Sequence, residues 1–218
     1  MDTKILSEIK AYVAGEEISL LPERAILLLQ DRILLVADLH FGKVEHFRKN
    51  GIALPPHSSR DDIQKLKELV QKTEPTEVIF LGDLFHSEYN NSWEEFRNMI
   101  LDFPDLKFTL IVGNHDILDH HKYDFLVLED QLELRNFIFT HEPLDIIIEG
   151  KYNLCGHIHP GVRLRGKAKQ SLRLPCFYFG KEMGIMPAFG TFTGTYVIKP
   201  QQGDQVFVIQ DKLIVQVA

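Results

Sequence analysis

Short apolar runs rich in β-branched residues recur along the first two-thirds of the chain, and they constrain the fold more than any other feature of the sequence. Each run is almost continuously hydrophobic, a pattern typical of strands that are buried on both faces. Such strands belong to a sheet that other layers cover on both sides. The predicted strands of this kind are Ala25–Leu29, Ile33–Ala37, Val78–Leu81, Phe108–Val112 and Phe137–Thr140.

Helical patterns separate these runs. Ser59 is suited to cap a helix whose apolar residues share one face, and Asp62 stands where a capping box needs an acid. Ser92 and Glu95 repeat this S-x-x-E start ahead of a second helix. The stretch Lys43–Asn50, which is followed by a glycine, predicts a shorter helix.

The pattern changes towards the C-terminus, where helices give way to short strands separated by Gly, Pro and Gln turns. The sequence contains no internal repeat and no Pro/Gly/Ser linker, so we expect one domain spanning residues 1–218. Alternating strands and helices with a β-rich end favour a layered α/β protein with an additional sheet. The predicted C-terminal strands are Leu172–Leu174, Tyr196–Ile198, Val206–Ile209 and Leu213–Val217.

Composition limits the classes of function. The 218 residues carry a formal net charge of −7, which counts against a general nucleic-acid binder with a basic face. No apolar run reaches the roughly 18–20 residues that a membrane span needs, and the first residues lack the apolar stretch of a secretory signal. Two cysteines, Cys155 and Cys176, are too few for a disulfide framework, and Cys155 is expected in the core. We therefore expect a cytoplasmic protein without a membrane partner.

Carboxylates and histidines follow the predicted strands directly. Because open α/β sheets bind ligands at the carboxyl ends of their strands, five separate segments can converge on one place. In Asp38-x-His40 and His157-x-His159, the two-residue period of a strand would turn both side chains to one side. Glycines precede three of the polar residues and allow close approach of the backbone.

The chemistry of these side chains indicates a metal centre. Carboxylates, imidazoles and one amide oxygen suit Mn, Fe or Zn ions, whereas structural zinc sites use thiolates and calcium prefers oxygen alone. The candidate ligands are too many for one tetrahedral ion, but they fit two ions that share a carboxylate. They are Asp38, His40, Asp83, Asn114, His141, His157 and His159.

The ordered set D-x-H, G-D-x-x-H, G-N-H-D, a single His and G-H-x-H spans residues 38–159 and resembles the calcineurin-like metallophosphoesterase superfamily. The stretches VADLHFGKVEHFRKNGIALP, GDLFHS, GHIHPGV and MPAFGTFTG are similar to those of the ligase-associated DNA damage response endonucleases, which are small bacterial proteins encoded beside an ATP-dependent DNA ligase and a helicase. The resemblance implies a four-layer α-β-β-α sandwich with mixed sheets, and a metal site at the C-terminal ends of the strands. It also implies two divalent ions, with Mn²⁺ preferred over Fe or Zn.

The resemblance assigns a role to each residue of the motifs. Asp83 would bridge the two ions, and a hydroxide between them would attack the phosphorus. His115 would protonate the leaving oxygen, His86 would contact the scissile phosphate, and Asp116 would orient the His115 ring. The first ion would be held by Asp38, His40, Asp83 and His159, and the second by Asp83, Asn114, His141 and His157.

By the same resemblance, the protein is expected to be a Mn-dependent DNA endonuclease of bacterial DNA repair, acting on single-stranded DNA and linked in function to the ligase and the helicase. Lys43, Arg48 and Arg163 are candidate contacts for the phosphate backbone, with an ordinary charged surface as the alternative. Two other functions stay open. One is a phosphomonoesterase or nucleotide pyrophosphatase acting on a small molecule, and the other is a binding module that keeps the fold without catalysis.

Aromatic residues of the C-terminal part leave one further choice open. They have the ring faces on which nucleobases stack, but packing of the second sheet is the favoured interpretation. These residues are Phe177, Tyr178, Phe179, Phe189 and Phe192.

Overall fold

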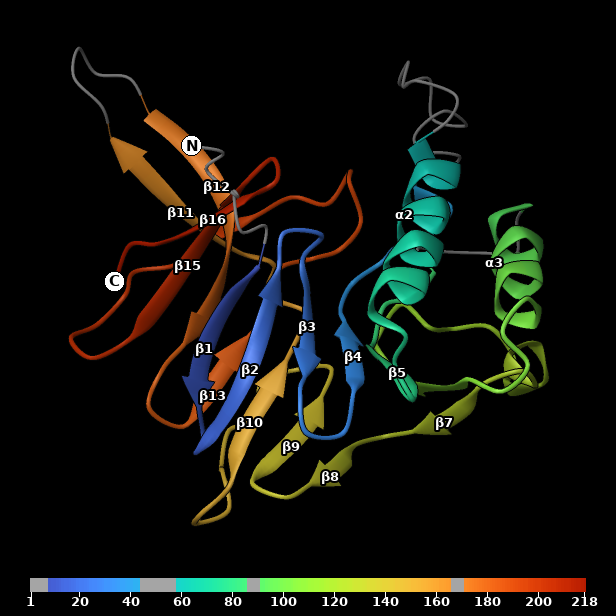
Figure 1. Cartoon of the computed structure of the whole chain (residues 1–218), viewed down its shortest axis with the longest axis horizontal. Helices are drawn as coiled ribbons and strands as arrows, with labels where there is room; N and C mark the ends of the chain where they lie inside the picture. The colour runs from blue at the N-terminus through green and yellow to red at the C-terminus, as the bar shows by residue number, and fades with distance from the viewer. Residues whose placement is uncertain (1–7, 44–57, 86–90, 166–170) are drawn as a thin grey trace, which may run out of the picture.

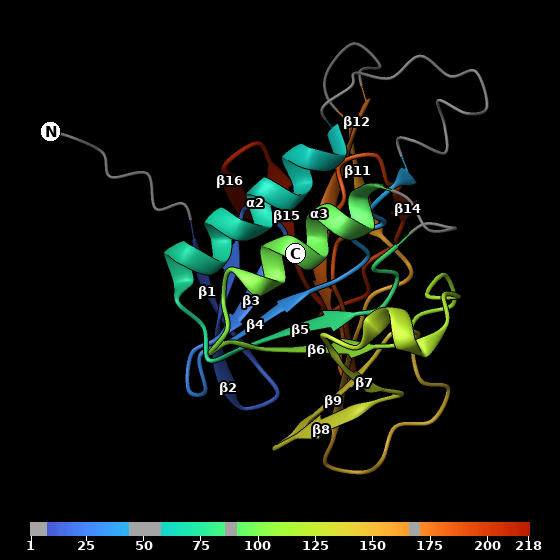
Figure 2. The same cartoon turned by 90° about the vertical axis from the view of Figure 1, so that its right-hand side faces the viewer.

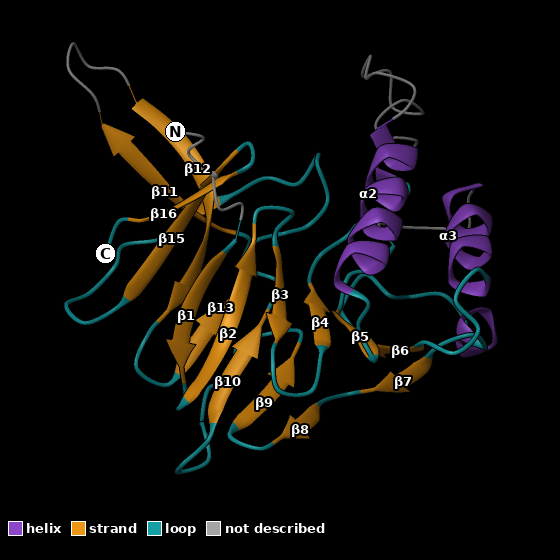
Figure 3. Cartoon of the chain, in the orientation of Figure 1, coloured by secondary structure: helices purple, strands orange, loops and turns teal. Residues whose placement is uncertain are grey.

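The computed structural model describes residues 8–43, 58–85, 91–165 and 171–218. Two β-sheets pack face to face, and α-helices cover the outer face of the first sheet (Figures 1 and 3). Figure 2 shows the two long helices lying side by side over the strands of that sheet. Both sheets contain parallel and antiparallel pairs, so the predicted α/β sandwich with mixed sheets is confirmed. None of the helices in the described ranges has the length and hydrophobicity of a membrane span.

The first sheet contains seven strands in chain order within these ranges. Strands β1 to β4 are antiparallel neighbours, whereas β4 to β7 are parallel. Parallel neighbours need crossover connections, and helices α2 (Ser58–Thr73) and α3 (Asn91–Leu101) supply two of them; the 3₁₀ turn η1 (His120–Tyr123) precedes β7. The strands are β1 (Ile9–Val13), β2 (Glu16–Leu21), β3 (Ala25–Leu28), β4 (Ile33–Val36), β5 (Glu77–Leu81), β6 (Lys107–Ile111) and β7 (Val127–Glu129).

The second sheet has the order β14-β11-β12-β13-β10-β9-β8, and β15 pairs with both β12 and β16. Strands β9, β10 and β13 are parallel neighbours, so β9 and β10 end at the same edge of the sheet. The strands are β8 (Leu132–Leu134), β9 (Phe137–Thr140), β10 (Tyr152–Cys155), β11 (Pro160–Arg165), β12 (Ser171–Phe179), β13 (Met183–Ile185), β14 (Tyr196–Val197), β15 (Gln205–Gln210) and β16 (Leu213–Gln216).

Strand alternation divides the apolar core into layers. In β4, Ile33 and Leu35 lie between the two sheets, whereas Leu34 and Val36 lie under the helices. This arrangement explains why the central strands are apolar at every position, as the sequence predicts. On the outer face of the second sheet, a smaller cluster around Leu174 and Cys176 takes the place of a helical layer among the described residues.

The predicted strands agree with the structure to within one residue at most ends. The hairpin of β1 and β2 was not predicted, because the predicted strands are continuous apolar runs, whereas β1 alternates exposed and buried residues and leaves Tyr12 66% exposed. The helix expected over Lys43–Asn50 lies outside the described residues except for Lys43. Cys155 is buried, as expected, and Cys176 is buried as well; both are free thiols, and burial raises the pKa of each.

Candidate metal centre

The ends of five strands carry the polar residues of the motifs. Strands β4, β5 and β6 of the first sheet and β9 and β10 of the second end close together, which brings these segments to one place. The connection is direct, because both carboxylate oxygens of Asp38 in the first sheet accept bonds of 3.0 Å from the backbone N–H of His157 in the second. The centre therefore lies across the junction of the two sheets.

The backbone of the candidate ligands differs from the strand geometry predicted for it. Asp38, His40, Asp83, His157 and His159 all have positive φ angles, between 49° and 64°. The pairs Asp-x-His and His-x-His converge because the chain has left the strand, so the two-residue strand period was the wrong reason for their convergence. A non-glycine residue in this left-handed region costs about 1–2 kcal/mol, and such strain persists only where surrounding contacts fix it.

Glycines next to these residues allow the close approach that the sequence predicts. A Cβ atom on Gly82, whose φ is +76°, would lie 2.2 Å from His141 Nδ1. A Cβ atom on Gly156 would lie 2.7 Å from Asp38 Oδ2. Both distances are below any real contact of a Cβ atom, so a side chain at either position would displace a candidate ligand.

The first ligand group consists of Asp38, His40 and His159, whose ligand atoms all lie within 4.8 Å of one another. Asp38 and His40 are buried, and His159 is half-buried. His159 Nε2 lies 3.3 Å from Asp38 Oδ1 and 3.4 Å from His40 Nε2. One carboxylate and two imidazoles thus point their donor atoms at a common position.

The second ligand group consists of Asp83, His141 and His157, whose ligand atoms also lie within 4.8 Å of one another. His141 Nε2 lies 3.4 Å from Asp83 Oδ1 and 3.1 Å from His157 Nδ1. Asn114 Oδ1 lies 3.0 Å from the same Nε2 atom, so the predicted fourth ligand also reaches this group.

Asp83 lies between the two groups. Its Oδ1 faces His141, and its Oδ2 lies 3.6 Å from Nε2 of His40 in the first group. One carboxylate thus offers a different oxygen to each group, which is the geometry that a bridging ligand requires.

The environment of His141 tests whether these residues suit a cation. The carbonyl oxygen of Leu81 lies 2.9 Å from His141 Nδ1 and only accepts hydrogen bonds, so Nδ1 of the neutral ring carries the proton. The lone pair of Nε2 then faces Asp83 Oδ1, Asn114 Oδ1 and His157 Nδ1. A carboxylate oxygen, an amide oxygen and two ring nitrogens thus converge on one position, which is a donor set that suits a divalent cation. The residues present therefore fit a divalent metal, and the Leu81 carbonyl fixes the ring in the metal-binding tautomer.

His115 lies beside the first group. Its ring centroid is 5.5 Å from that of His40, and its backbone N–H donates to Asp83 Oδ1 at 2.9 Å. The ring is half-buried, so the predicted proton donor lies at the edge of the candidate centre. His86, the predicted phosphate contact, lies outside the described residues.

Asp116 makes contacts that differ from its predicted role. Its Oδ1 accepts the backbone N–H of Leu84 at 2.9 Å and that of Phe85 at 3.4 Å, and its Oδ2 accepts the N–H of Gly113 at 2.9 Å. Burial raises the pKa of this carboxyl to about 6 despite these bonds. Both oxygens thus join the turn after β5 to the turn after β6 through backbone N–H groups, and among the described residues neither oxygen bonds to the His115 ring. We propose that Asp116 supports the site structurally rather than by orienting His115.

Replacing Asp116 by Ala is expected to lower the free energy of unfolding by about 2–4 kcal/mol, because backbone donors would be left buried without acceptors. Chemical denaturation of the wild type and the variant measures this change. A variant of unchanged stability that has lost catalysis would show instead that Asp116 acts in the chemistry.

The predicted phosphate contacts are separated in the fold. Lys43 is half-buried near the centre, and burial lowers the pKa of its ammonium, with the Asp83 and Asp38 carboxylates partly opposing that shift. Arg163 is exposed on β11, directly opposite Arg173 of β12. Arg48 lies outside the described ranges.

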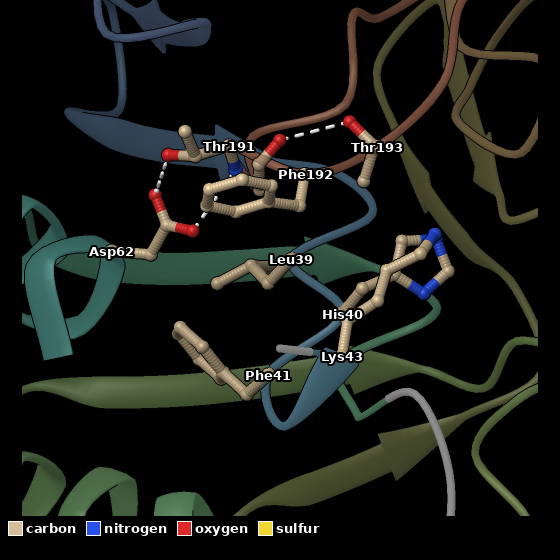
Figure 4. Close-up of a pocket in the computed structure, with 9 residues that line it drawn as sticks. Leu39, His40, Phe41, Lys43, Asp62, Thr191, Phe192 and Thr193 are labelled. Atoms are coloured by element: carbon tan, nitrogen blue, oxygen red, sulfur yellow. Dashed lines mark hydrogen bonds between the residues drawn. The ribbon is translucent and has the colours of Figure 1, made fainter. Parts of the chain in front are cut away.

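Most of the C-terminal aromatic residues pack in the protein, which is the interpretation that the sequence favoured over base stacking. Phe177, Phe179 and Phe189 are buried in the core, and Tyr178 donates to Asp204. Phe192 differs, because it is half-buried in a small pocket next to His40 (Figure 4). The pocket is lined by Leu39, His40, Phe41, Lys43, Asp62, Gly190, Thr191, Phe192 and Thr193.

A mixed α/β sandwich with two ligand groups at its strand ends defines the class of metal-dependent phosphoesterases. The chain belongs to the calcineurin-like phosphoesterase family, whose model, Metallophos, matches residues 31–179. This range contains all the predicted ligands, and the predicted membership is confirmed.

Among solved structures, the chain is similar to the nuclease MPE of Pseudomonas putida, with 26% identity, a TM-score of 0.80, and coverage of 96% of this chain and 100% of that one. It is also similar to YfcE, a phosphoesterase from E. coli, with 14% identity, a TM-score of 0.44, and coverage of 85% and 98% of the two chains. No curated protein matches the sequence.

Proposed function

We propose that the protein is a two-metal phosphodiesterase that cleaves DNA. The observation that carries this proposal is the pair of ligand groups on either side of Asp83, with His115 at their edge. The similarity to a nuclease along almost the whole of both chains supports nucleic acid as the substrate.

In this proposal Asp38, His40, Asp83 and His159 hold one ion, and Asp83, Asn114, His141 and His157 hold the other. Two bound divalent ions supply an activated water and neutralise charge on the phosphoryl oxygens.

The protein's own groups orient the ligands, supply a proton and bind the substrate. The Leu81 carbonyl keeps the proton of His141 on Nδ1, away from the ligand atom. We propose that the half-buried His115 ring, at the edge of the centre, donates a proton to the leaving oxygen. We propose that Lys43 attracts the phosphate, that Arg163 and Arg48 contact the backbone further along, and that His86 contacts the scissile phosphate.

The identity of the metal ion, the kind of DNA, the biological role and the location follow from the family resemblance of the sequence, and they belong to the same proposal. We propose Mn²⁺ as the physiological ion, since carboxylate, amide and imidazole ligands suit it. We also propose single-stranded DNA as the substrate, a role in bacterial DNA repair together with a ligase and a helicase, a cytoplasmic location, and one domain over residues 1–218.

A small phosphorylated molecule is the second candidate substrate, and one observation favours it. A cleft beside Asn114 and His141 has three acidic residues in its wall, Asp130, Glu142 and Asp145. These charges repel a polyanion more than a small monoester.

A comparison of three substrates with Mn²⁺ tests the choice between them. We expect turnover of a bis-aryl phosphate diester and of single-stranded DNA, with little turnover of an aryl phosphate monoester. Turnover of the monoester alone would exclude the nuclease and favour the small-molecule enzyme. Turnover of none of the three, by protein that binds two Mn²⁺, would favour a non-catalytic module.

A further inference from the structure

Residues 186–196, here called the strap, run from the second sheet across the ligand-bearing strand ends. The Phe189 N–H donates to the Ala37 carbonyl at 2.8 Å, and the Gly190 N–H donates to the Asp38 carbonyl at 3.2 Å. The Tyr196 N–H donates to the His159 carbonyl at 2.9 Å. The strap therefore binds the backbone of two residues of the first ligand group.

The strap also lies close to the third residue of that group. A Cβ atom on Gly190 would be 2.3 Å from the Leu39 carbonyl oxygen, so the strap backbone lies directly against the segment that carries Asp38 and His40. His40 lines the same small pocket as Thr191 and Thr193 (Figure 4). Within the described part of the chain, no hydrogen bond joins the strap to Asp83, His141 or His157.

Helix α2 holds the strap through Asp62. One carboxylate oxygen accepts the Thr191 backbone N–H at 2.9 Å, and the other accepts the Thr191 hydroxyl at 2.6 Å (Figure 4). Asp62 is 6% exposed whereas Thr191 is exposed, so the two bonds are partly buried, with the carboxylate as the shielded partner. Asp62 was predicted to belong to a capping box, but both of its oxygens bind a residue 129 positions away in the sequence.

Two cations hold the carbonyl groups of the same segment. Arg24 donates to the carbonyls of Ala188 and Gly190, at 3.0 and 3.3 Å. Lys65 donates to the Phe189 carbonyl at 2.9 Å and lies 3.6 Å from Asp62. Three charged side chains thus bind consecutive peptide groups of the strap. An ordinary surface loop has fewer such bonds and is more mobile.

We propose that Asp62 and Thr191 are positioning residues for the first metal ion. Their bonds hold the strap in place, and the strap holds Asp38 and His159 in their left-handed conformations, with φ angles of 53° and 51°. Loss of the bonds frees these two ligands and weakens the first site but not the second. The proposal rests on the proposed metal centre and is independent of the substrate.

The test measures Mn²⁺ binding to each site by calorimetric titration and by electron paramagnetic resonance of the bound ions. The variants are Asp62→Ala, which removes both bonds, and Thr191→Val, which removes only the hydroxyl bond and preserves volume. His159→Ala and His157→Ala identify which binding event belongs to which group. We expect the first site to lose about 10–100-fold in affinity, as when supporting hydrogen bonds of metal ligands are removed, while the second site changes less than about twofold.

Two further variants separate positioning from a general loss of structure. Thr191→Ser keeps the hydroxyl that Thr191→Val removes, and is expected to bind Mn²⁺ at the first site with wild-type affinity. Asp102→Asn removes an exposed ion pair with Lys67 of the same helix α2, and is expected to change neither site. Equal weakening of both sites, or unchanged affinity in both Asp62→Ala and Thr191→Val, would overturn the proposal. A wild-type protein that fails to bind two ions would overturn the metal centre itself, which is a distinguishable result.

Discussion

Replacing Asp83 by Asn is expected to abolish tight binding of both metal ions and to lower turnover by about 10³-fold, equivalent to about 4 kcal/mol of barrier. The side chain keeps its shape but loses its charge, and its Oδ1 and Oδ2 each face a different ligand group. A single substitution therefore acts on two sites at once. Mn²⁺ titration and steady-state turnover of the diester measure the two effects, with the wild type expected to bind two equivalents.

Asp130→Asn is the matched control for this variant. Asp130 is an exposed acid in the cleft beside Asn114, so its loss changes the local charge equally without removing a ligand. It is expected to leave the binding stoichiometry at two ions. Wild-type affinity for both ions in Asp83→Asn would reject the bridging role.

Replacing His115 by Ala is expected to lower kcat by about 10²–10⁴-fold, the usual contribution of a general acid, while Mn²⁺ binding stays unchanged. The backbone N–H of residue 115 still donates to Asp83 in this variant, so the bridging carboxylate keeps its support. The loss should be largest for DNA, whose leaving alkoxide needs a proton, and smallest for a diester with a weakly basic aryl leaving group.

His121→Ala serves as the control, because its side chain is 69% exposed and lies on η1. It is expected to retain wild-type kcat on both substrates. An equal loss on DNA and on the activated diester in His115→Ala would show that His115 does not protonate the leaving group. A loss of metal affinity would show that it acts on the ligands instead.

The positions of the strand ends were predictable, because the apolar runs and the polar residues that follow them indicate the same boundaries. Continuous apolar runs such as Val78–Leu81 predict doubly buried strands, and the polar residues that follow them must then gather at one edge. The resemblance to the phosphoesterase family implied the division of the ligands into two groups, and in each group three of the predicted ligands lie within reach of one another. For these residues, neighbours in the sequence determine where the side chains lie.

Long-range contacts were not predictable in the same way. Asp62 fits a capping box by its spacing, yet it binds Thr191, which lies 129 positions further along the chain. Asp116 follows His115 directly, yet its carboxylate turns away to backbone groups of two different turns. In both cases a buried carboxylate accepts hydrogen bonds from a segment distant in the sequence, through the Leu84 N–H for Asp116 and the Thr191 N–H for Asp62, and the local pattern does not reveal such partners.

Each ligand group draws on both sheets: Asp38 and His40 follow β4 while His159 follows β10, and Asp83 follows β5 while His141 and His157 follow β9 and β10. An ion bound at either group would thus cross-link two halves of the sandwich, in addition to the apolar core and the hydrogen bonds that already join them. The unfolded chain cannot reproduce this arrangement, so the free energy of unfolding rises with the concentration of free metal by mass action. Cellular metal supply would in this way govern how long the folded enzyme persists, and not only how fast it turns over.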